Sequence, residues 1–206
     1  MTKIITFITL LLVSTLWSQT NYEKEMQDAL TTWQDGNSNE AIAKFEKIAL
    51  VEKKSVLPSY YVSLINTTLA FKTKDFKEMN LFIQKAQKAQ DEVNKFLPDD
   101  PEVLVLQAMI HTASIVYDPL ANGRQLSAVV LNIYKMAEGI APNNPRVVLS
   151  KAEFEIGMAE YFGQDTKPMC EQIAKSIELF ANFKPESKFH PTWGIDKATK
   201  AIQNCK

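Results

Sequence analysis

A seven-residue pattern occurs twice in this chain and limits the fold more than any other feature of the sequence. Its two copies, Leu97-Pro-Asp-Asp-Pro-Glu-Val and Ala141-Pro-Asn-Asn-Pro-Arg-Val, begin 44 residues apart. In each copy the first proline ends one helix. The second, Pro101 or Pro145, suits the first position of the next helix, where its missing N–H removes no hydrogen bond. The preceding Asp or Asn can cap that helix. A helix-stop and helix-start signal that returns in this way is typical of a helical repeat array.

The rest of the sequence indicates one amphipathic helix after another. Apolar residues recur at spacings of three and four, and no segment shows sustained alternation of apolar and polar residues. Only six glycines occur among 206 residues, which argues against a β-rich fold. The expected helices cover residues 22–34, 39–51, 58–72, 76–96, 101–117, 125–140, 145–162, 169–183 and 193–204. We therefore predict an all-α fold built from helical hairpins.

The paired helices resemble the tetratricopeptide repeat (TPR), which needs a small residue where the two helices of a pair cross closely. Small residues occupy that position at Ala29, Ala108 and Ala152. Repeat units begin near Tyr22, Tyr60, Pro101 and Pro145, so their spacing of 38 to 44 residues exceeds the usual 34. The tract 144–153 and the tail 183–194 are also similar to small exported TPR-like proteins of Bacteroidetes-type bacteria. The resemblance implies one TPR-like α-α superhelix over residues 19–206, with about four helix pairs and a C-terminal capping helix. It implies no activity.

The first 18 residues have the pattern of a secretory signal peptide. Lys3 precedes the uncharged, mostly apolar stretch Ile4–Trp17, and Ser18 is a small residue at a cleavage point before Gln19. A stretch of about fourteen apolar residues is short for a bilayer span, so a permanent anchor is the weaker alternative. We predict export to the periplasm or the extracellular space, with no stable membrane span.

The chain contains two cysteines, Cys170 and Cys205. In an exported protein an even pair usually forms a disulfide, whereas two cysteines without a nearby histidine make a poor metal site. We therefore predict a disulfide that attaches the final helix to the repeat before it.

Composition and motifs favour binding over chemistry. The formal charge of −1 leaves no basic surplus for nucleic acid. No zinc-protease, nucleophile-elbow or phosphate-loop motif is present, and His111 and His190 stand without ligand-spaced partners. We therefore expect no catalytic residues, no cofactor, no metal site and no enzymatic activity.

The concave face of such an array is the candidate binding surface, because the first helix of each pair lines it. The repeat register places a mainly apolar set there: Trp33, Phe71, Met109, Arg146 and Glu153. We predict that these residues contact a protein or peptide partner of unknown identity. An alternative is a helical carrier that encloses a small apolar ligand in a cavity. A third interpretation also stays open, in which these side chains only pack on one another.

Overall fold

The computed structural model describes residues 21–205, and their regular secondary structure is entirely helical. The predicted signal peptide, residues 1–18, lies outside this range. Residues 21–34 form the first described helix. It is followed by α2 (Ser38–Val51), α3 (Leu57–Lys72), α4 (Phe76–Asn94), α5 (Pro101–Tyr117), α6 (Pro119–Ile140), α7 (Pro145–Phe162), α8 (Lys167–Asn182) and α9 (Ile195–Asn204). The predicted all-α fold is confirmed. None of these helices is both long and apolar enough to cross a membrane.

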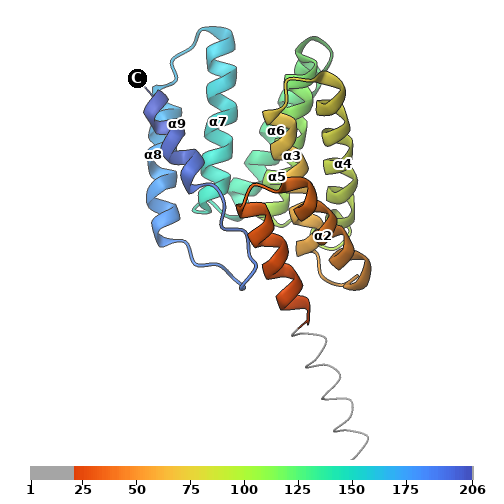
Figure 1. Cartoon of the computed structure of the whole chain (residues 1–206). Coiled ribbons are helices and arrows are strands. Elements are labelled where there is room, and N and C mark those ends of the chain that lie inside the picture. Colours follow the sequence, from red (N-terminus) through yellow and green to blue (C-terminus); the bar gives the residue numbers. More distant parts are fainter. Residues whose placement is uncertain (1–20, 206) are drawn as a thin grey trace, which may run out of the picture.

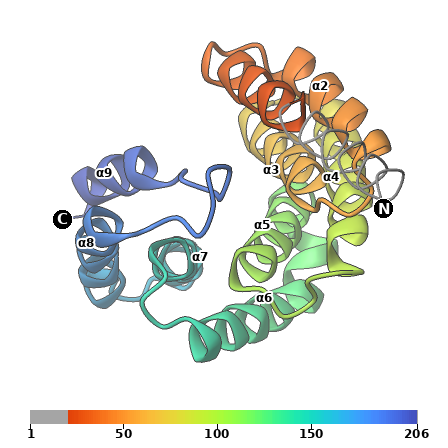
Figure 2. The ribbon, with the colours of Figure 1, turned by 90° about the horizontal axis from the view of Figure 1, so that it is seen from below.

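The helices form antiparallel pairs that stack into an open arc (Figure 1). The pairs are α3 with α4, α5 with α6, and α7 with α8, while α9 packs on α8. The helix 21–34 pairs with α2, to which it is joined by the ion pair between Asp28 and Lys44. Figure 2 shows the arc from below, with α3, α5 and α7 on its inner side and α4, α6 and α8 outside. This is the predicted arrangement of four helix pairs and a capping helix.

The two repeated cassettes start helices in the same way. The Asp100 carboxylate accepts the backbone N–H groups of residues 102 and 103, and Asn144 Oδ1 accepts those of residues 146 and 147. Pro101 and Pro145 open the two helices. Each cap satisfies N–H groups that have no partner within the helix.

The start of α6 differs from its prediction. The sequence predicts a connection at Asn122-Gly123 and a helix from Gln125, whereas α6 begins at Pro119. Asp118 caps it by accepting the N–H of Ala121. Asn122 donates to the carbonyl of Ser114 at the end of α5, so this residue closes the tight turn from inside the helix.

Small residues let the paired helices approach closely. Ala29, Ala108 and Ala152 are all buried, as the TPR pattern requires. The main hydrophobic core runs from the helix 21–34 through α7. A separate cluster joins α7, α8 and α9 around Leu149 and Ile173. The C-terminal unit therefore has a core of its own.

The two cysteines lie where the sequence predicts a disulfide. The Sγ atoms of Cys170, in the first turn of α8, and Cys205, after α9, are 2.07 Å apart. The bond attaches the capping helix to α8 at the outer end of the arc.

The double substitution Cys170→Ser/Cys205→Ser should destabilise the C-terminal unit alone. Closing a loop of about 35 residues stabilises a protein by about 3–4 kcal/mol in chain-entropy terms. Amide hydrogen exchange should show lost protection in α9, with α2 to α4 unchanged. Equal loss of protection throughout the chain would contradict this separation.

Candidate functional site on the concave face

A buried ion pair joins the two cassettes at the base of the concave face. Glu102 and Arg146 occupy the same position, the second residue of α5 and of α7. Arg146 Nε lies 2.6 Å from Glu102 Oε2, and its Nη2 lies 2.7 Å from Oε1. Asn144 Nδ2 also donates to Glu102 Oε1, at 2.6 Å. The Arg146 side chain is 0% exposed. This two-point geometry holds α5 and α7 together at their N-terminal ends.

Residues 183–194, which we call the strap, cross the inner side of the arc (Figures 1 and 2). The strap leaves α8 and reaches the N-terminal half of the chain. Tyr61 OH donates to the carbonyl of Phe189 at 3.0 Å, and Trp193 Nε1 donates to Tyr60 OH at 2.9 Å. The Phe189 ring is buried and packs edge-on against Tyr22, with centroids 5.9 Å apart. The strap therefore rests on the N-terminal ends of the first helices.

The strap also covers the ion pair. Arg146 Nη1 donates to the carbonyl of Trp193, at 3.4 Å, and the centroid of the Phe183 ring lies 4.3 Å from the guanidinium carbon. His190 Nε2 lies 3.9 Å from Glu102 Oε1. An arginine that stacks on an aromatic face keeps favourable contacts after it has lost its water. The Glu102–Arg146 ion pair and the strap residues Phe183, His190 and Trp193 are therefore in one connected set of contacts.

Tyr60, which accepts the hydrogen bond from the Trp193 indole, stays uncharged. Burial, and then the nearby Glu102 carboxylate, raises the pKa of Tyr60 well above its ordinary value. Its hydroxyl is thus protonated at any physiological pH and can accept the hydrogen bond from Trp193.

Exposure along the first helices shows which part of the concave face is open. In the first half of each helix the inward positions are buried, as at Leu64 of α3 and Val105 of α5. At the C-terminal ends the corresponding side chains reach solvent: Phe71 is 40% exposed and Val116 is 50% exposed. Inward positions are therefore buried toward the strap, and Phe71 and Val116 leave exposed apolar surface at the opposite end, which we call the open half.

Three of the predicted site residues belong to the filled part. Trp33 is partly buried and packs on Tyr61, with ring centroids 6.0 Å apart. Met109 lies in the main core. Arg146, expected at a charged edge of the groove, is instead buried against Glu102 because the strap covers it. Its side chain is not accessible while the strap is in place.

The other two predicted residues are accessible. Phe71 lies at the C-terminal end of α3. Glu153 of α7 is partly exposed and accepts a hydrogen bond from Lys197 Nζ of α9 at 2.7 Å. The structure thus divides the five residues between a packed region and an open one. Their role in binding stays a prediction.

Two parts of this site are absent from the sequence-based set. Glu102 could have been found, because it holds the position of Arg146 in the other cassette and carries the opposite charge. The sequence marks Lys184–Pro191 as a proline-rich connection, but its contacts could not be predicted, because they join residues 128 and 133 positions apart.

The histidines do not form a metal centre. His111 on α5 is partly buried, its Nε2 lies 3.1 Å from Gln107 Nε2, and burial lowers its pKa. His190 lies in the strap. Within residues 21–205, no cluster of three or more His, Cys, Asp or Glu side chains is arranged to hold a metal ion.

Removing one partner of the ion pair should be far more damaging than removing both charges. Arg146→Ala leaves Glu102 buried without its cation, and such changes lower the free energy of unfolding by about 3–5 kcal/mol. The double variant Glu102→Leu/Arg146→Met should recover most of the loss, as measured by urea unfolding. Lys95→Ala, which breaks the exposed pair with Glu92, is the control and should cost about 1 kcal/mol or less. A similar loss in Arg146→Ala and Lys95→Ala would contradict the account.

Comparison with known proteins shows which solved structures have a similar fold. No protein-family model matches the chain, and no curated protein matches it. Among solved structures, the HusA haemophore from Porphyromonas gingivalis is similar with a TM-score of 0.78 and 20% identity, over 90% of this chain and 92% of that one. A thermophilic TPR protein from Thermus thermophilus is similar with a TM-score of 0.60 and 10% identity, over 89% and 98% of the two chains. At these identities the likeness is one of fold. The chain has a TPR-like helical repeat fold.

Proposed function

We propose that this protein is an exported, non-enzymatic binding protein. Its ligand would occupy the open half of the concave face, at the C-terminal ends of α3 and α5. The observation that carries the proposal is the change in exposure along the first helices. The inward positions are buried in the first half of these helices and become exposed toward Phe71 and Val116. A ligand at that end could reach the face without displacing the strap.

The chemistry of the open half favours an apolar ligand. Phe71 and Val116 present apolar side chains. The nearby inward positions are Thr68 and Thr112, whose hydroxyls donate to carbonyls of their own helices at residues 64 and 108. The hydroxyl hydrogens of Thr68 and Thr112 are thus not free to bond a ligand, and each threonine still offers a methyl group. Burying such a surface against an apolar ligand is favourable in proportion to the area removed from water.

A flat apolar ring system such as haem is the first ligand class to test. Support comes from the similarity to the HusA haemophore, which extends over nine-tenths of both chains. Phe71 and Val116 are exposed to solvent, so a ring bound against them could keep charged substituents in water. This differs from the enclosed cavity considered for a carrier.

An extended peptide from a partner protein is the second candidate. The strap itself supports it, because a non-helical segment already lies on this face with Phe189 and Trp193 among the buried or partly buried side chains. The similarity to a TPR protein points the same way. A partner segment could continue along the face beyond the end of the strap.

We also propose that the protein is exported and acts by binding alone. Export is supported by the signal-like residues 1–18 and by the disulfide, since such bonds persist in oxidising compartments. A purely binding role is supported by the character of the concave face, which offers packing surfaces and the ion pairs Glu102–Arg146 and Glu153–Lys197.

Phe71→Ala should weaken ligand binding about tenfold or more. Burying a phenylalanine ring contributes about 1.5–3 kcal/mol, and each 1.4 kcal/mol changes a dissociation constant tenfold. The measurement is a titration of the mature protein with haemin, followed by absorbance. Phe96→Ala is the matched control, because Phe96 is also exposed but follows α4, away from the open half.

The same pair of variants tests the peptide alternative. If haemin does not bind, aromatic-containing peptides selected from a random library replace it, and Phe71→Ala should weaken their binding in the same way. The proposal fails if neither ligand class binds, or if binding is equally affected by Phe71→Ala and Phe96→Ala.

A further inference from the structure

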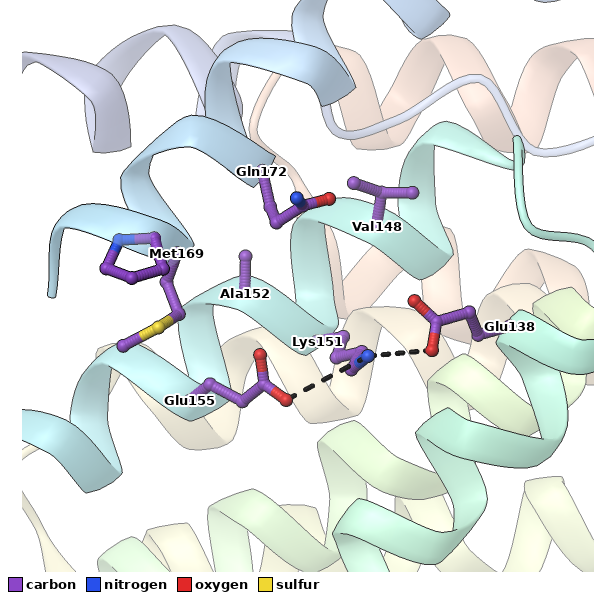
Figure 3. Close-up of a pocket in the computed structure, with 8 residues that line it drawn as sticks. Glu138, Val148, Lys151, Ala152, Glu155, Met169 and Gln172 are labelled. Atoms are coloured by element: carbon purple, nitrogen blue, oxygen red, sulfur yellow. Dashed lines mark hydrogen bonds and ion pairs between the residues drawn. The ribbon is translucent and has the colours of Figure 1, made fainter.

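A second recess lies away from the concave face, between α6, α7 and α8. It is a cavity of about 240 Å³. Figure 3 shows its lining, with Glu138 supplied by α6, Lys151 and Glu155 by α7, and Met169 by α8. The proposed function uses none of these residues. The cavity therefore needs its own explanation.

Charge in this cavity is unbalanced. Lys151 Nζ lies 2.7 Å from Glu138 Oε2 but 4.0 Å from Glu155 Oε1. Lys151 thus forms a close ion pair with Glu138, whereas the Glu155 carboxylate is farther from the same ammonium group. Two carboxylates and one ammonium leave a net charge of −1. A further cation would be stabilised here, whereas an anion would have to compete for a lysine that is already paired.

Glu155 is the carboxylate most in need of a cation. Its side chain is only 31% exposed. Burial raises its pKa, Lys151 opposes that effect, and the Glu138 carboxylate adds to it. A partly desolvated carboxylate beside a second carboxylate gains from an additional positive charge.

One part of the cavity wall is apolar, and Gln172 adds a polar side chain from α8. Val148 and Ala152 line the α7 side, and Met169 approaches from α8 beside Glu155 (Figure 3). We propose that this cavity binds a primary ammonium group on a short apolar stem, with Glu155 pairing with the ammonium and Met169 contacting the stem. The group could belong to a free alkylamine or to a lysine side chain of a partner.

The test is an NMR titration of the full mature protein with n-pentylamine. Saturable shifts should appear in the amides of α7 and α8 around the cavity. Glu155→Gln should weaken binding roughly tenfold, as expected for losing a charged hydrogen-bonding partner. Glu160→Gln is the matched control, since Glu160 is exposed on the same helix and does not line the cavity. It should bind like the native protein.

Two further probes separate the outcomes. n-Pentanol has the same stem without the charge and should bind much more weakly. Nα-acetyl-lysine amide tests the partner source: its binding assigns the cavity to a protein lysine, and its failure beside a binding pentylamine assigns it to a free amine. The proposal is overturned if neither amine binds, if pentanol binds as well as pentylamine, or if Glu155→Gln has no effect.

Discussion

The buried pair between Glu102 and Arg146 is the interaction on which the shape of the inner face depends. Removing both charges from water is expensive, so such a pair is tolerated only with good geometry and further partners. Here the contact is two-pronged, Asn144 adds a hydrogen bond, and Phe183 covers the guanidinium. Arg146 also stands in the first turn of α7, where the helix dipole disfavours a cation, and Glu102 offsets that effect.

This pair makes the strap part of the fold rather than a loose connection. The carbonyl of Trp193 accepts from Arg146, and its indole donates to Tyr60, so one residue joins α7 to α3 across the arc. Phe189 adds a buried ring and a carbonyl that accepts from Tyr61. The chain thus covers part of its own concave face. The proposed ligand would lie at the other end, where Phe71 is exposed.

The sequence predicts the local part of this structure well. The cassette prolines and their capping residues mark helix ends through short-range sterics and hydrogen bonds, so α5 and α7 begin where expected. The disulfide follows from having only two cysteines in a chain that begins with a signal-like segment. The predicted start of α6 is wrong because Asn-Gly usually marks a turn. In the structure, Asn122 lies within the helix and donates a hydrogen bond back to the end of α5.

The candidate site is much less predictable from sequence. Repeat register correctly distinguishes the inner helices from the outer ones, but it carries no information on what lies against them. Arg146 therefore appears as a groove residue, and only the folded chain shows that the strap buries it. Glu155 likewise looks like solvated helix charge until α6 and α8 place Glu138 and Met169 around it.

The central claim is that a ligand binds beside the strap and does not replace it. Mapping backbone amide shifts on addition of protoporphyrin, or of a selected peptide, tests it most directly. The account predicts changes at the C-terminal ends of α3 and α5, around Phe71 and Val116, with the amides of Phe189 and Trp193 unmoved. Changes centred on the strap, with Phe71 and Val116 unaffected, would contradict it.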